Sequence, residues 1–190
     1  MTTMQSFNGL AGACCKVFGF TAAVALMTLF AVPAKAEGRG HAAVLNQIEC
    51  LALAIYFEAR GEPEAGQRAV AHVVMNRVDD ADFPNSVCDV VQDGGQEVLH
   101  RCQFSWWCDG NSTEPRDVAA WERSMVMART VYWNYSDDPT LGALWFHANY
   151  VDPSWNQVFT RGPKIGMHIF YTRPGDDTPA SGSPQLAQTP

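Results

Sequence analysis

The chain has few of the residues that metal chemistry and nucleic-acid binding require. Its 190 residues include only 5 histidines, and neither a Cys-x-x-Cys nor a His-Glu-x-x-His motif occurs. Without such ligand spacing, we expect no metal site and no cofactor. Basic side chains are also in the minority, with 13 Lys and Arg against 20 Asp and Glu and a net charge of −7. Because phosphate binding needs a basic face, nucleic acid is not an expected partner.

The apolar run at 17–32 is too short for a typical membrane span. It holds 16 residues, whereas a helix needs roughly 20 to cross a bilayer. Lys16 precedes the run and Ala34-Lys35-Ala36 follows it as a small-x-small cleavage site, so residues 1–36 are typical of a secretory signal peptide. We therefore expect a periplasmic or extracellular protein that does not stay in the membrane after cleavage. A retained membrane anchor is the alternative.

Export changes the interpretation of the cysteines. Four of the six lie beyond the signal peptide, namely Cys50, Cys88, Cys102 and Cys108. An even number in an exported domain predicts two disulfides, for which three pairings are possible. Cys102 and Cys108 are close enough in sequence to close a short loop. In that pairing, Cys50 and Cys88 would join a helix to a later segment.

The stretch 48–63 predicts a helix with a charge on its apolar stripe. Four apolar residues have the three-and-four spacing of a buried helical face: Ile48, Leu51, Ala54 and Ile55. The next position on that face is Glu58, and Gly61 and Pro63 end the helix just beyond it. Glu58 should therefore lie in the last turn, near the mouth of a cleft. Burial raises the pKa of a carboxyl group, which suits Glu58 to act as a general acid.

A structural role for Glu58 is the alternative. A glutamate on an apolar face can be one half of a buried ion pair, and Arg60, Arg68 or Arg77 could supply the other half. Periodicity alone does not separate this interpretation from catalysis.

The following segments predict further helices. Residues 37–45 are interpreted as a linker, and Glu64–Val78 as the second helix. A short helix ending at Val91 would be capped by the Asn or Ser at positions 85 and 86. Thr113 should start the third long helix. The expected core face of that helix comprises Val118, Trp121, Met125, Ala128 and Tyr132.

Near the carboxyl end, the pattern becomes typical of strands. Residues 143–147 and 167–171 are short, aromatic and β-prone, and we interpret them as two strands of a small antiparallel sheet. From Arg173 onward Pro, Gly, Ser, Thr and Gln dominate, so 173–190 should be a disordered tail. The prediction is an α+β fold with one domain at 46–172.

Several motifs resemble those of the SleB/CwlJ family of cell-wall hydrolases. The most specific is Ile55-Tyr56-Phe57-Glu58-Ala59-Arg60-Gly61-Glu62-Pro63, followed by Gly66-Gln67 and by 69–78. Supporting matches are Gln103-Phe104-Ser105, 139–147 with Ser154-Trp155, and 165–171. The resemblance covers about Cys50 to Tyr171. It implies a mostly helical lysozyme-like or lytic-transglycosylase-like domain that acts on peptidoglycan in the cell wall.

The resemblance also implies a mechanism and a set of substrate-binding residues. Family members are similar to lytic transglycosylases, which cleave the MurNAc–GlcNAc bond with one catalytic Glu, here Glu58. A second catalytic carboxylate is not obvious, and the candidates are Glu62, Asp109 and Asp152. The expected substrate-binding residues are Gln103, Phe104, Ser105, Phe146, His147, Trp155, His168 and Tyr171.

Two other functions fit parts of the sequence. A wall peptidase could use Cys108 as its nucleophile with His147 or His168 as its base, provided that the thiol is free. A non-catalytic wall-binding module would use the aromatic residues to bind sugar, with Glu58 in a structural role.

Overall fold

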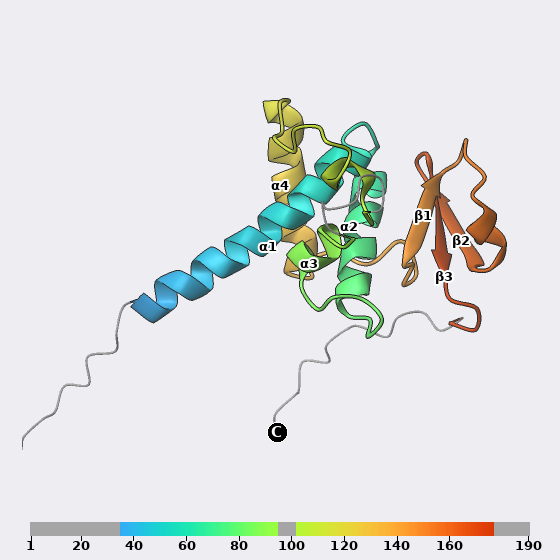
Figure 1. Cartoon of the computed structure of the whole chain (residues 1–190), viewed down its shortest axis with the longest axis horizontal. Coiled ribbons are helices and arrows are strands. Elements are labelled where there is room, and N and C mark those ends of the chain that lie inside the picture. Colours follow the sequence, from blue (N-terminus) through green and yellow to red (C-terminus); the bar gives the residue numbers. More distant parts are fainter. Residues whose placement is uncertain (1–34, 95–101, 177–190) are drawn as a thin grey trace, which may run out of the picture. The chain divides into compact units, whose positions relative to one another are not determined.

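The computed structural model describes residues 35–94 and 102–176. Figure 1 shows a group of helices followed along the chain by a small sheet. The helices are α1 (Lys35–Ala59), α2 (Glu64–Val78), α3 (Val87–Val91) and α4 (Val118–Tyr132). Short 3-10 turns occur at η1 (Ser105–Trp107) and η2 (Ser154–Gln157), and the strands are β1 (Trp145–Ala148), β2 (Thr160–Ile165) and β3 (His168–Thr172). The predicted α+β class is confirmed.

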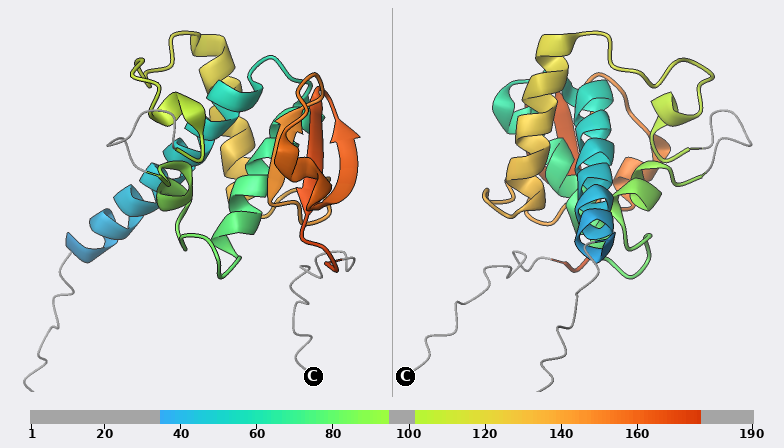
Figure 2. Two further views of the ribbon diagram at one scale, coloured as in Figure 1. Left: turned by 45° about the vertical axis from the view of Figure 1, so that its right-hand side comes forward. Right: turned by 90° about the vertical axis from the view of Figure 1, so that its left-hand side faces the viewer.

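Helix α1 lies at the centre of the helical core. Its apolar stripe is buried as predicted, since Leu51 and Ile55 are both 0% exposed. It packs against α2, α3 and α4, and Figure 2 shows α4 alongside it. By length and hydropathy 40–59 would also pass for a membrane span. In this domain, however, the stretch supplies the core face that the other helices cover.

The linker predicted at 37–45 is wrong, because α1 already begins at Lys35. No proline interrupts 35–59, and Ala42, Ala43 and Leu45 favour helix. Two glycines early in the segment lower its helix propensity without breaking the backbone hydrogen bonds. The expected signal peptide, 1–36, lies outside the described residues except for Lys35 and Ala36, which are helical.

Helices α2 and α3 follow the prediction closely. Helix α2 spans the predicted residues Glu64–Val78. Ser86 caps α3, since its hydroxyl oxygen accepts a hydrogen bond from the backbone N–H of Asp89 at 3.2 Å. The disulfides are Cys50–Cys88, which joins α1 to α3, and Cys102–Cys108, which closes a loop. The disulfide pairing considered from the sequence is confirmed.

Helix α4 differs from the prediction in its start and its buried face. It begins at Val118, capped by the Asp117 carboxylate, which accepts from the Ala120 N–H at 3.0 Å. The preceding backbone is held away from helical geometry because the buried Tyr56 hydroxyl accepts N–H groups from Arg116 and Asp117. The predicted core residue Val118 is 68% exposed. The buried residues are Ala120, Ser124, Met127, Ala128 and Val131.

The sheet has three antiparallel strands in the order β1-β3-β2. The two predicted strands are present and pair with each other, with Phe146 opposite Phe170. The sequence analysis missed β2, which lies at the edge of the sheet and contains Gly162 and Pro163. Its pairing with β3 is irregular between Arg161 and Lys164. An edge strand tolerates proline there because that residue need not donate to the ladder.

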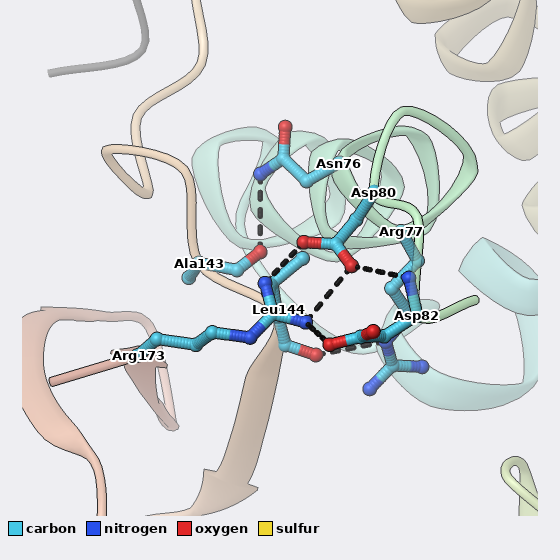
Figure 3. A network of polar contacts seen from close by, with 7 residues as sticks. All are labelled: Asn76, Arg77, Asp80, Asp82, Ala143, Leu144 and Arg173. Carbon is cyan, nitrogen blue, oxygen red and sulfur yellow. Dashed lines mark hydrogen bonds and ion pairs between the residues drawn. The ribbon is translucent and has the colours of Figure 1, made fainter. Parts of the chain in front are cut away.

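The start of the predicted tail is fixed in place. The Arg173 guanidinium donates hydrogen bonds to Asp80 and, at 2.7 Å, to Asp82. It also lies 5.7 Å from the centroid of the Trp145 ring. Figure 3 shows this network between the end of β3 and the loop after α2. Disorder from Arg173 onward is therefore wrong for 173–176, and residues 177–190 lie outside the described part of the chain.

Candidate active site

Glu58 is half-buried in the last turn of α1, one residue before the helix ends at Ala59. Burial raises the pKa of its carboxyl group from 4.5 to about 7, although the positive charge of Arg77 opposes the increase. Near neutral pH the group is therefore divided between its protonated and ionised forms. A carboxyl group with such a pKa can both give and accept a proton, as acid–base catalysis requires.

The three arginines that could have paired with Glu58 have other partners. Arg68 forms an ion pair with Glu64 at 2.7 Å, and Arg60 lies over the Tyr56 ring. Arg77 donates from Nε to the Leu144 carbonyl at 2.8 Å. Within 35–94 and 102–176, no basic group forms a salt bridge with Glu58. This geometry does not support a structural ion pair.

Arg77 supplies the nearest identified positive charge. It is 2% exposed, and burial lowers the pKa of its guanidinium to about 10, partly offset by the negative charge of Glu58. Its guanidinium carbon lies 5.4 Å from the ring centroids of both Phe83 and Phe104. Arg77 is thus a fixed cation that moderates the pKa of Glu58 without neutralising it.

Trp106 is the second neighbour of Glu58. Its indole N–H favours the ionised form of the Glu58 carboxyl group, although it is buried and donates no hydrogen bond to a described residue. The ring stacks on Phe57, with centroids 4.6 Å apart. We interpret this N–H as a donor close to the carboxylate that is not yet fully engaged.

The Cys102–Cys108 loop carries the predicted Gln103-Phe104-Ser105 motif. With its amide oxygen turned toward Arg77, Gln103 accepts from both guanidinium nitrogens, at 3.1 and 3.3 Å. Phe104 is 2% exposed and packs beside Arg77, so its ring cannot offer a face to a sugar as predicted. Ser105 is exposed. The loop therefore places Gln103 and Phe104 against Arg77, the residue whose charge acts on Glu58.

The predicted residues of the sheet form a separate cluster. His147 contacts the Ala148 carbonyl through Nδ1 and the Tyr171 hydroxyl through Nε2, both at 2.9 Å. Because a carbonyl only accepts, we assign the proton to Nδ1, so that Nε2 accepts from Tyr171. Trp155 packs edge-on against both rings. The polar atoms of His147 and Tyr171 have internal partners, which argues against the direct substrate contacts predicted for them.

His168 and Phe146 lie next to each other on the sheet. Their ring centroids are 5.1 Å apart in an edge-to-face contact, and His168 is 8% exposed. Burial lowers the pKa of His168, whereas the negative charge of Glu62 acts to raise it. Its Nδ1 is buried and has no hydrogen-bond partner among the described residues. His168 therefore remains a candidate for a polar contact, whereas Phe146 contributes to packing.

Glu62 fixes the β2–β3 turn to the end of α1. Its Oε2 accepts from the backbone N–H of Met167 at 2.8 Å. The space around it depends on two glycines: a Cβ on Gly166 would lie 1.9 Å from Oε2, and one on Gly66 would lie 2.9 Å from the Glu62 Cβ. Because its carboxylate is engaged in this contact, Glu62 is poorly suited to be the second catalytic carboxylate.

Gly166→Ala tests this contact. Gly166 has φ of +58°, so a Cβ would be strained in addition to meeting the Glu62 carboxylate. Left-handed backbone costs about 1–2 kcal/mol and a lost charge-assisted hydrogen bond about 1.5–3 kcal/mol. We expect the free energy of unfolding to fall by about 3 kcal/mol, measured by chemical denaturation. Gly175→Ala is the control for backbone strain, because Gly175 also has positive φ but an added Cβ would meet nothing within 4 Å. An equal loss in both variants would contradict a specific role for the Glu62 contact.

The wall-peptidase alternative can now be assessed. Cys108 is bonded to Cys102, so the thiolate that a Cys-His peptidase requires is absent. The wall-peptidase hypothesis is therefore wrong for the oxidised protein. Among residues 35–94 and 102–176, no group of three or more metal-ligating side chains could hold a metal ion.

Residues 61–171 match the family model described as Cell Wall Hydrolase. The chain belongs to this family. Similar proteins include spore cortex-lytic enzymes from Bacillus cereus and Bacillus subtilis, each 35% identical over 127 residues, or 66% of this chain. That alignment covers 44% of the Bacillus cereus protein and 37% of the Bacillus subtilis protein. The chain thus spans less than half the length of these relatives.

Two solved structures are also similar. The SleB catalytic domain from Bacillus cereus is 32% identical with a TM-score of 0.50, and the match covers 67% of this chain and 91% of that domain. The catalytic domain of the germination-specific lytic transglycosylase SleB from Bacillus anthracis is 32% identical with a TM-score of 0.51, with 67% and 94% covered. The family-model match begins at Gly61, three residues after Glu58. The role of Glu58 therefore rests on its own geometry.

Proposed function

We propose that this domain cleaves peptidoglycan glycan strands at the MurNAc–GlcNAc bond, with Glu58 as general acid and then general base. The observation that carries the proposal is a half-buried carboxyl group with a pKa of about 7 and no salt bridge to a described residue. The family supports a wall substrate, and the names of the similar proteins supply the reaction type. Their role in spores is not carried over to this chain.

The proposed reaction needs one carboxyl group. Protonated Glu58 gives its proton to the glycosidic oxygen, and the bond from that oxygen to the muramic anomeric carbon breaks. The 6-hydroxyl of the same muramic residue then attacks the anomeric carbon and passes its proton to the Glu58 carboxylate. The products are a 1,6-anhydromuramic end and a free GlcNAc hydroxyl, so Glu58 returns to its protonated form without water being consumed.

The neighbours of Glu58 fit both halves of this cycle. Desolvation keeps the group partly protonated near pH 7, which suits the first proton transfer. After that transfer, the Arg77 charge and the Trp106 N–H both favour the carboxylate. Gln103 accepts from Arg77 and helps to hold the guanidinium in place. Arg77 and Trp106 therefore act on the acid rather than on the substrate.

Two of the three carboxylates considered as a second catalytic group, Glu62 and Asp152, already accept hydrogen bonds, which favours intramolecular attack over hydrolysis. Glu62 accepts from the Met167 backbone, and Asp152 is exposed and accepts from the Asn156 side chain at 2.6 Å. These contacts make both carboxylates less suited to hold a nucleophilic water. Mass spectrometry of fragments released from purified sacculi tests this directly, because anhydro products are lighter by one water. Fragments with free reducing ends alone would contradict the transglycosylase mechanism.

Digestion should depend on pH through Glu58. Because the first step needs the protonated acid and the pKa is about 7, kcat/KM should fall about tenfold per pH unit above that value. Rates on soluble glycan strands between pH 5 and 9 would measure this. A profile that stays flat through pH 8 would contradict Glu58 as the acid.

A further inference from the structure

A cavity adjoins the end of α1. It has a volume of about 590 Å³, within the range typical of small-ligand sites. Its lining combines aromatic, basic, acidic and neutral polar residues: Tyr56, Phe57, Arg60, Asn111, Ser112, Glu114, Arg116 and Asp117. Glu58 is not among these residues, so the cavity is distinct from the acid itself.

The cavity nonetheless adjoins the Glu58 neighbourhood through Trp106. Its wall includes Phe57, whose ring stacks on Trp106, and Trp106 is the residue whose N–H acts on Glu58. Arg60 lies two residues beyond Glu58, in the turn that follows α1. Phe57 and Arg60 therefore place the cavity within about one helix diameter, roughly 10–12 Å, of Glu58.

The two arginines of the cavity are exposed and form no salt bridge with a described residue. Among the described residues, no carboxylate lies within salt-bridge distance of either guanidinium. The Arg60 guanidinium lies 5.0 Å from the Tyr56 ring centroid, and the Tyr56 hydroxyl accepts from the backbone N–H groups of Arg116 and Asp117. Tyr56 thus ties both arginine-bearing segments together. Guanidinium groups recognise carboxylates through paired hydrogen bonds.

The acidic residues of the cavity restrict the ligand further. Glu114 and Asp117 balance the charges of Arg60 and Arg116, so a purely anionic ligand would meet repulsion as well as attraction. A ligand with both carboxylate and ammonium groups matches this lining better. The peptide attached to the muramic lactyl group has that chemistry when it is not cross-linked. Four extended residues span roughly 13 Å, enough to cover a distance of about one helix diameter.

We propose that this cavity binds the free, zwitterionic end of the stem peptide on the muramic residue being cleaved. The inference rests on the proposed function and deepens it, because it makes the enzyme selective for peptide-bearing, uncross-linked strands. Losing one arginine–carboxylate contact should lower kcat/KM on such strands about tenfold.

The test compares Arg60→Gln and Arg116→Gln on two soluble substrates: strands that carry tetrapeptides, and strands from which an amidase has removed the peptides. We expect a roughly tenfold loss for each variant on the first substrate and none on the second. Arg123→Gln, an exposed arginine on α4 outside this cavity, should match the parent on both. Equal losses on both substrates, or no loss on either, would overturn the inference while leaving the proposed function intact.

Calorimetric titration with a synthetic stem tetrapeptide separates the two proposals. The parent should bind the peptide, and Arg60→Gln should weaken binding about tenfold. If the parent binds the peptide but digests neither substrate, the proposed function fails and the cavity assignment stands. If the parent digests strands but does not bind the peptide, the cavity assignment fails.

Discussion

Glu58→Gln is expected to lower the rate of sacculus digestion by about 10²- to 10⁴-fold, the usual effect of removing a general acid. Glutamine keeps the shape and hydrogen-bonding reach of the side chain but cannot deliver a proton. Because Arg77 is fixed by Leu144, Gln103 and two phenylalanine rings rather than by Glu58, the site should keep its geometry. The measurement is the release of soluble fragments from purified sacculi per unit of folded protein.

The same substitution should not destabilise the fold. The pKa of Glu58 is about 7 in the folded protein and close to 4.5 when unfolded, so the folded state holds the proton more tightly. Stability contributed by this group is present below pH 4.5 and is lost as pH rises toward 7. Glu58→Gln should therefore match the parent near pH 4 and exceed it by about 1–3 kcal/mol at pH 8. Breaking a buried ion pair would instead cost roughly 3–5 kcal/mol.

Glu49→Gln is the matched control, because Glu49 is an exposed glutamate on the same helix. It should change neither digestion nor the pH dependence of stability. If Glu58→Gln melts like the parent and still digests sacculi, Glu58 is not the acid. If it unfolds more readily and loses activity only in proportion to folded protein, Glu58 has a structural role, as a non-catalytic wall-binding module would require.

Features set by local pattern were predictable from the sequence. The stripe of α1, the caps that bound α3, and the aromatic strands β1 and β3 each have a short-range signal. Glu58 was predictable because it is a charged residue on an otherwise apolar helical face, about one turn before the Gly-x-Pro sequence that ends the helix. The short spacing of Cys102 and Cys108 suggested the pairing of Cys50 with Cys88, which was one of three possible pairings.

Features set by tertiary contacts were not predictable. Helix α4 starts at Val118 because Tyr56, sixty residues earlier, holds the backbone before it. Strand β2 contains Gly162 and Pro163 and exists because β3 offers it an edge. His147 and Tyr171 carry suitable chemistry for substrate binding, but only the structure shows that they satisfy each other. The sequence offered Arg77 as a possible ion-pair partner of Glu58. Only the structure shows that the Leu144 carbonyl holds the Arg77 side chain, so that its charge lies near Glu58 without forming a salt bridge.

Loss of the Cys50–Cys88 disulfide should mainly reduce stability, whereas loss of the Cys102–Cys108 disulfide should mainly reduce activity. Cys50–Cys88 closes a sequence separation of 38 residues and Cys102–Cys108 one of 6. Loop-closure entropy predicts that replacing both cysteines of the longer bridge with alanine lowers the free energy of unfolding by about 4 kcal/mol. The same replacement in the shorter bridge should lower it by about 2 kcal/mol. Thermal unfolding should register the longer bridge as a fall in Tm of roughly 10 °C.

Activity should follow the other order. The Cys102–Cys108 loop carries Gln103, Phe104 and Trp106, which contact Arg77 or act on Glu58. Opening it should loosen this environment and lower kcat/KM by about 10-fold or more, since small misplacements in a catalytic site are costly. The variant without Cys50–Cys88 should keep the parent's activity per folded molecule at temperatures well below its Tm. If the longer bridge alone governed both stability and activity, the small loop would have no part in positioning Arg77 and Trp106 around Glu58.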